Sequence, residues 1–119
     1  MDNSVNIKVA DLIGSPLCIS SEDGNKVYDQ ISALIKDGRD IVLSFERVKL
    51  LISLFLNAAI GRLYGSFNED EIRAHLRVEG LTPEDMEILK KVVANAKKYY
   101  ANPRQYDEAW KNTEGEDEE

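Results

Sequence analysis

Alternating apolar and polar residues mark two short segments of this chain, residues 5–9 and 74–79, and this period of two is typical of β-strands with one solvated face. The segment Leu17-Cys18-Ile19 follows a turn at Gly14-Ser15-Pro16 and predicts a strand over residues 16–20 that pairs with the first as a hairpin. Residues 40–45 contain the continuous apolar run Ile41-Val42-Leu43, the pattern of a strand buried on both faces. These patterns therefore predict four strands, over residues 5–9, 16–20, 40–45 and 74–79.

Apolar residues three or four positions apart predict three long helices, over residues 22–37, 53–65 and 83–101. Ser20 and Ser21 precede the first helix, and either hydroxyl can cap it. Ser53 stands at the start of the second helix, after the predicted central strand, and its hydroxyl can cap that helix. The central strand and this second helix make a βα unit, which the other elements are expected to cover.

The chain beyond residue 101 has a different character. Proline disfavours a helical residue before it, so Asn102-Pro103 ends the third helix. Tyr106 and Trp110, four residues apart, predict a short amphipathic helix over about Arg104 to Lys111. Their rings either pack back on the domain or form an exposed anchor for a protein interface. Because the last residues are mostly acidic, we expect one domain over residues 1–112 and a disordered acidic tail over residues 113–119.

The 119 residues carry a formal net charge of −7, which argues against nucleic-acid binding because such proteins need a basic face for the phosphates. No apolar run approaches the roughly 20 residues of a membrane helix. The first residues lack the pattern of a secretory signal. A single cysteine, Cys18, allows no internal disulfide and fits a reducing compartment. We therefore expect a cytoplasmic protein with no membrane or nucleic-acid partner.

Patterns typical of catalytic or metal sites are missing from the sequence. His75 is the only histidine, it lies on a predicted strand, and no cysteine or second histidine is near it. No nucleophile elbow, P-loop or calcium-binding loop occurs. Cys18 precedes Glu22 and Asp23, whose charges disfavour a thiolate. The sequence therefore predicts no enzymatic activity, no catalytic residue, no metal site and no cofactor.

The central part of the chain resembles the STAS-like family of unknown function, a divergent branch of the STAS domains found in anti-sigma-factor antagonists and sulphate transporters. The residues that carry the resemblance are Ile41-Val42-Leu43-Ser44-Phe45-Glu46, Val48, Ser53, Phe55-Leu56-Asn57 and Gly61-Arg62-Leu63-Tyr64. A looser similarity extends from about Val5 to about Tyr100. The resemblance implies an α/β sandwich of STAS type, in which three main helices cover mostly one face of a mixed four-stranded sheet and a short C-terminal helix follows.

The resemblance also implies a regulatory site at Ser53. In anti-sigma-antagonist STAS domains, a partner kinase phosphorylates a serine at the start of the helix after the central strand, and the phosphate blocks docking. A phosphate adds nearly two negative charges, which a helix N-terminus favours. This sequence departs from the pattern, because Ile52 stands where those domains carry aspartate and Leu54 where they carry a small residue. Two interpretations stay open, a buried or half-buried capping serine and a phospho-switch.

Three hypotheses for function follow. The first is a bacterial or phage regulatory module without catalysis, whose implied partner is a histidine-kinase-like ATPase or an anti-sigma-type protein. Its predicted contact residues are Ser20, Ser21, Ser53, Asn57, Arg62, Tyr106 and Trp110. The second is a STAS domain that binds a small ligand or nucleotide where helix N-termini meet strand C-termini. The third is a homo-oligomeric structural or inhibitory protein of phage type, such as a homodimer, that acts on a host complex and has Tyr106 and Trp110 in its interface.

Overall fold

The computed structural model of the protein describes residues 4–101. The predictions for a C-terminal helix, for Tyr106 and Trp110 and for an acidic tail over residues 113–119 lie outside these residues. No helix between residues 4 and 101 is both long enough and apolar enough to span a bilayer.

The strands form two small parallel sheets. β1 (Val5–Lys8), β3 (Ile41–Ser44) and β5 (Leu76–Glu79) make a three-stranded sheet in the order β1-β3-β5. The short strands β2 (Leu17–Cys18) and β4 (Leu50–Leu51) pair with each other, also in parallel. The α/β class is confirmed, but the expected mixed four-stranded sheet is wrong.

A short helix explains why the expected hairpin is also wrong. β1 ends at Lys8, one residue earlier than the alternating pattern predicted, because Val9 is the first residue of the short helix α1 (Val9–Ile13). Val9 and Ile13 are four apart and both buried, so the segment has one apolar side at helical spacing. Gly14 ends the helix in the left-handed conformation, at φ 73°. β2 then pairs in parallel with β4, in a sheet separate from that of β1, so β1 and β2 form no hairpin.

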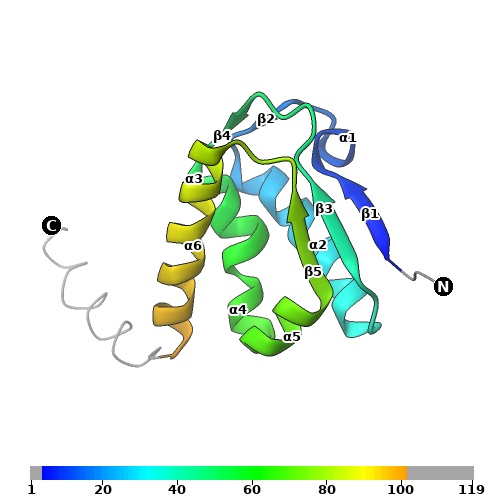
Figure 1. The fold of residues 1–119 in the computed structure, drawn as a ribbon, viewed down its shortest axis with the longest axis vertical. Coiled ribbons are helices and arrows are strands. Elements are labelled where there is room, and N and C mark those ends of the chain that lie inside the picture. Colours follow the sequence, from blue (N-terminus) through cyan, green and yellow to red (C-terminus); the bar gives the residue numbers. More distant parts are fainter. Residues whose placement is uncertain (1–3, 102–119) are drawn as a thin grey trace, which may run out of the picture.

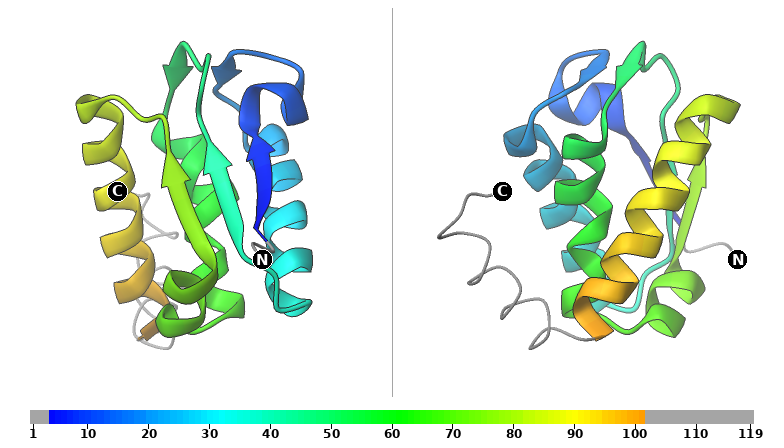
Figure 2. Two further views of the ribbon diagram at one scale, coloured as in Figure 1. Left: turned by 45° about the vertical axis from the view of Figure 1, so that its right-hand side comes forward. Right: turned by 90° about the vertical axis from the view of Figure 1, so that its left-hand side faces the viewer.

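The three long helices are confirmed. α2 (Ser21–Lys36) and α6 (Pro83–Ala101) flank a middle helical segment that comprises α3 (Ser53–Leu56), a π-helical turn η1 (Asn57–Gly61) and α4 (Leu63–Ser66). All three lie on one face of the three-stranded sheet, with the middle segment between the other two (Figure 2). A further helix, α5 (Glu69–His75), takes the first two residues of the strand predicted at 74–79.

The opposite face of the sheet carries no helix within the described residues (Figure 2). Ile7, Leu43 and Val78 are aligned across the three strands and point toward the helices. The residues one position before them, including Val42, form a row on the other face, where Val42 is only half-buried. The prediction that residues 40–45 form a strand buried on both faces is therefore wrong, and the expected one-sided covering is confirmed.

The main core lies between the inner face of the sheet and the helices. Its fully buried side chains include Phe45, Phe55, Ile31, Ile41, Leu43, Leu56, Ile60 and Leu63. α2 approaches the middle helical segment closely at Gly24. A Cβ atom added there would lie 2.6 Å from the carbonyl oxygen of Phe55 and 2.8 Å from the Cβ atom of Ala58. Gly24 thus allows two helix backbones to come together beside the region described next.

Candidate functional site

One end of the molecule collects the starts of the helices and the ends of the strands. The three parallel strands point toward this end, and α2, α3 and α6 all begin there (Figure 1). In open parallel sheets this is the end at which ligands and partners commonly bind, because loops and free helix N–H groups gather there. The β2–β4 pair lies across the same end (Figure 1).

The β2–β4 pair fixes how the first turns of α2 and α3 lie. The backbone N–H of Lys49 donates to Pro16 O at 2.8 Å, and that of Ile52 donates to Cys18 O at 3.1 Å. Cys18 and Leu51 are aligned and buried, while Leu17 and Leu50 are aligned and exposed. Because α2 begins three residues after β2 and α3 begins two residues after β4, these hydrogen bonds bring the two helix starts together.

Large apolar side chains gather at this end without cover from the described residues. Leu17, Ile19, Leu50 and Leu54 are between 40% and 52% exposed. In residues 4–101 only one other large hydrophobic side chain, Tyr100, is classed as exposed. Leu17 and Leu50 are direct neighbours in the β2–β4 pair, and Leu54 lies in the first turn of α3, which follows β4 after one residue. We call these four residues and the surface around them the apolar end. They are the main concentration of uncovered apolar side chains in the described part of the chain.

Ser53 lies within the apolar end as the first residue of α3, and it is exposed. The N-cap position belongs to Ile52, whose extended backbone has φ −121° and ψ 161°. No side chain caps this helix, and the Ser53 hydroxyl makes no hydrogen bond to any residue between 4 and 101. The expectation of a buried or half-buried capping serine is therefore wrong, because the helix begins at Ser53 itself, one residue earlier than a cap at Ser53 requires.

The two serines at the start of α2 have different roles. Ser20 is the N-cap, and its Oγ accepts a hydrogen bond from the backbone N–H of Asp23 at 3.0 Å. Ser21 is the first helical residue and is exposed, with no hydrogen bond from its hydroxyl to the described residues. Both lie at the same end as Ser53, as the predicted contact surface requires.

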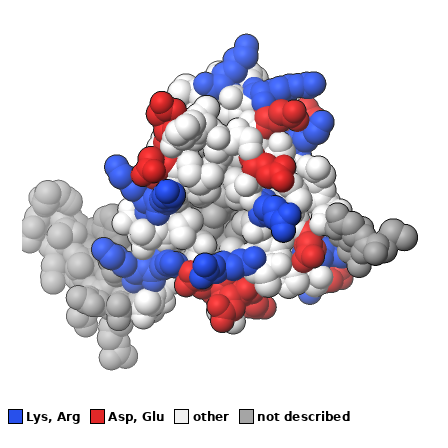
Figure 3. Space-filling view, viewed as in Figure 1, with Lys and Arg blue, Asp and Glu red and all other residues white. Residues whose placement is uncertain are grey.

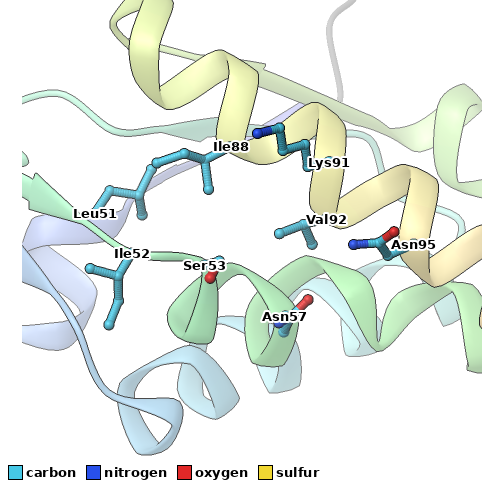
Figure 4. A pocket seen from close by; sticks show the side chains of 8 residues that line it. All are labelled: Leu51, Ile52, Ser53, Asn57, Ile88, Lys91, Val92 and Asn95. Atoms are coloured by element: carbon cyan, nitrogen blue, oxygen red, sulfur yellow. The ribbon is translucent and has the colours of Figure 1, made fainter.

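A groove runs from the apolar end down between α3 and α6 (Figure 4). Its volume is about 440 Å³. Apolar and polar side chains line this α3–α6 groove: Leu51, Ile52, Ser53, Asn57, Ile88, Lys91, Val92 and Asn95. Asn57 and Asn95 come from opposite walls, and Lys91 lies at the rim on α6 (Figure 4). Two members of the predicted contact surface, Ser53 and Asn57, therefore share one hollow.

Arg62 lies apart from the other predicted contact residues. It follows Ser53 by nine positions, which is about 13 Å along a helix. Its guanidinium lies 3.9 Å above the centre of the Tyr28 ring on α2 and donates to Asn25 Oδ1 at 2.7 Å. Arg62 therefore links the middle helical segment to α2, and it does not lie together with Ser53.

Ionisable groups near this end offer little reactive chemistry. Burial of the Cys18 thiol, together with the negative charges of Asp23 and Asp85, raises its pKa to about 12, so it stays neutral. His75 lies at the other end of the sheet, where its Nδ1 is 2.9 Å from Oδ1 of Asp40. Residues 4–101 contain no group of three or more histidine, cysteine or acidic residues placed to hold a metal ion.

Sequence reasoning missed the exposed apolar residues and the α6 side of the groove. Leu17 and Ile19 lie on either side of buried Cys18, so the alternation of a strand indicated that Leu17 and Ile19 share one face. It did not indicate that this face is uncovered. Lys91 and Asn95 lie four apart on α6, but only the packing of α6 beside α3 brings them opposite Asn57 (Figure 4).

Comparison with known proteins identifies a family. The family model of a STAS-like domain of unknown function matches residues 23–86, which is more than half of the chain. The matched part contains most of α2, the middle helical segment with Ser53, and the start of α6. Neither the curated proteins nor the solved structures contain a significant match.

Proposed function

Because the chain belongs to the family of STAS-like domains of unknown function, we propose that it is a regulatory module without catalysis that binds a protein partner through its apolar end. The observation that carries the proposal is the exposure of Leu17, Ile19, Leu50 and Leu54 around the free hydroxyl of Ser53. Exposed apolar surface that is grouped in this way and bordered by polar side chains is typical of protein interfaces.

The size of the exposed surface is enough for a regulated contact. Full burial of a leucine or isoleucine side chain contributes about 1.5 to 3 kcal/mol. Since these four side chains are roughly half exposed, covering the remainder contributes about 1 kcal/mol each, or about 4 kcal/mol together. Contributions of this size from a few central residues dominate many interfaces. The apolar end would then act as the centre of the contact, with Ser20, Ser21 and Asn57 near its rim.

Ser53 is the proposed switch of this contact. A phosphate on its oxygen would place nearly two negative charges among Leu50, Leu54 and Ile52. A partner that buries these side chains would have to desolvate the phosphate, which is costly without a paired cation. The exposure of Ser53 supports access by a kinase. The resemblance to anti-sigma-factor antagonists supports a histidine-kinase-like ATPase or an anti-sigma-type protein as the partner.

Capture of partners from the native host tests this proposal. Tagged wild-type protein, Leu54→Asp and Ser53→Asp would be compared, and bound proteins identified by mass spectrometry. We expect one partner to be retained by the wild type and lost, by at least roughly tenfold, from both variants. Ala33→Asp adds the same charge at an exposed position of α2 away from this end and should retain the partner. A partner bound equally by Leu54→Asp and wild type would refute docking at the apolar end.

The behaviour of Ser53→Asp separates docking from switching. If Leu54→Asp loses the partner and Ser53→Asp keeps it, the docking surface stands and the switch is wrong. Circular dichroism of each variant must match that of the wild type, because a partner lost through unfolding carries no information about the contact.

The α3–α6 groove favours a second candidate function, the binding of a small ligand or nucleotide. Its volume of about 440 Å³ and its four polar side chains, Ser53, Asn57, Lys91 and Asn95, are compatible with a small polar molecule. A ligand of this kind should raise the melting temperature of the wild type and have less effect on Asn57→Leu. An unchanged melting temperature across a panel of nucleotides would argue against nucleotide binding.

A further inference from the structure

We propose that the α3–α6 groove binds the chain's own C-terminal segment, with Trp110 against the apolar wall of the groove and the acidic residues that follow it beside Lys91. This inference does not depend on the proposed partner, because it concerns two parts of one chain. It rests on the lining of the groove, on the charge along one side of α6, and on the length of chain that follows Ala101.

The lining of the groove suits an amphipathic peptide. Leu51, Ile88 and Val92 give it apolar walls over which an aromatic ring can lie (Figure 4). Asn57 and Asn95 lie on opposite walls, and neither side chain makes a hydrogen bond to another residue between 4 and 101. Each carboxamide can donate to and accept from a peptide backbone, so an extended or irregular segment could be held from both sides.

The charge along this side of α6 favours an acidic segment. Lys91 and Lys98 recur at helical spacing with Asn95, and neither forms an ion pair within the described part of the chain. By contrast, Lys90 lies 3.5 Å from Glu87, and Lys97 lies 2.8 Å from Glu69. Figure 3 shows acidic side chains over the first part of α6 and basic side chains over its middle and lower part. The C-terminal segment supplies the complement, because five acidic residues follow Thr113: Glu114, Glu116, Asp117, Glu118 and Glu119.

The C-terminal segment is long enough to reach the groove. At about 1.5 Å per residue, Asn95 lies roughly 9 Å and Ile88 roughly 20 Å before Ala101 along the axis of α6. An extended chain spans up to roughly 3.4 Å per residue, so Tyr106 can reach about 17 Å from Ala101 and Trp110 about 30 Å. Pro103 disfavours continuation of the helix, which allows the chain to reverse. Because both parts belong to one chain, a weak contact is sufficient for substantial occupancy.

The fluorescence of Trp110 tests the inference without a label, because this is the only tryptophan in the chain. We expect the full-length protein to show emission at shorter wavelength, and weaker quenching by acrylamide, than a peptide of residues 102–119. Lys91→Glu removes an attraction and adds a repulsion, and Asn95→Glu adds a repulsion, so each should lower the ratio of bound to free segment roughly fivefold. Emission and quenching should then approach those of the peptide. Lys90→Glu gives the same change in net charge one residue from Lys91, outside the groove, and should behave as the wild type.

Three results would overturn the inference. Trp110 in the folded wild type could be as accessible as in the peptide, which would mean that the segment does not bind. It could be shielded equally in the wild type and in both groove variants, which would place it elsewhere on the molecule. Its shielding could instead fall on dilution, in parallel with the mass measured by light scattering, and the segment would then bind a second copy of the chain.

Discussion

Replacement of Gly24 by alanine should destabilise the protein, although alanine is the better helix former. Gly24 lies in the first turn of α2, where it faces the middle helical segment. A Cβ atom at this position would lie 2.6 Å from Phe55 O, 2.8 Å from Ala58 Cβ and 3.3 Å from Ala59 N. The contacting atoms belong to the backbone or are fixed to it, so no flexible side chain can move aside. The two helices would have to separate.

The magnitude follows from two opposing contributions. Adding a methyl group to a well-packed contact costs about 1 to 3 kcal/mol, and two separations below 3.0 Å place this site at the upper limit, about 3 kcal/mol. The change from glycine to alanine within a helix returns about 1 kcal/mol. The free energy of unfolding should therefore fall by about 2 kcal/mol. For a domain of this size, the melting temperature should fall by about 8 °C.

Gly61 provides the matched control, since it is also a buried helical glycine in the same helical layer. A Cβ atom added there meets Val92 Cγ1 at 3.5 Å and Asn57 Oδ1 at 3.6 Å, which is ordinary van der Waals contact. Gly61→Ala should therefore be neutral or stabilising by up to about 1 kcal/mol. Thermal and urea unfolding followed by circular dichroism would measure both variants. If Gly24→Ala is as stable as the wild type, the close approach of α2 to the middle helical segment is wrong.

Two further predictions concern the start of α2 and the buried thiol. Ser20→Ala removes the hydrogen bond that caps the backbone N–H of Asp23 and should lower the free energy of unfolding by about 1 kcal/mol. Ser21→Ala should change the free energy of unfolding by less than about 0.5 kcal/mol. Equal effects of the two variants in urea unfolding would contradict the assignment of the cap to Ser20. Cys18 should not react with a thiol reagent at pH 8 in the native protein and should react fully in guanidinium, because its pKa is raised to about 12. Since the fold favours the neutral thiol, this contribution to stability is complete below pH 9 and is lost as the pH rises toward 12; rapid labelling of the native protein at pH 8 would refute the burial of Cys18.

The helices could be predicted because each carries its own signal. α2 and α6 have apolar residues at a spacing of three and four, and polar or charged residues on the other sides. The strands were harder, since β2 and β4 contain two residues each and a pair of residues does not encode a direction. Val9 shows the limit most clearly. It continues the alternation of β1 and also begins the helical spacing with Ile13, and contacts with the core selected the helix.

The candidate site was predicted in part. The sequence placed Ser20, Ser21 and Ser53 at the starts of two helices, and the structure brings these starts together through the β2–β4 pair. It did not predict that Ser53 would be exposed, because Ile52 and Leu54 on either side suggested an apolar environment. Leu54 does contribute an apolar side chain beside Ser53, but Leu54 is itself exposed to solvent and does not bury the serine.

By itself, the sequence determined the type and position of the long elements, because the side-chain period of a helix or strand is a property of the local backbone. The 119 residues also lack the sequence patterns typical of a catalytic or metal site. Only the tertiary structure decided which strands pair, which apolar residues remain uncovered and which polar residues face one another across α3 and α6. These properties depend on contacts between segments far apart in the chain. A leucine has the same local pattern whether or not another element covers it.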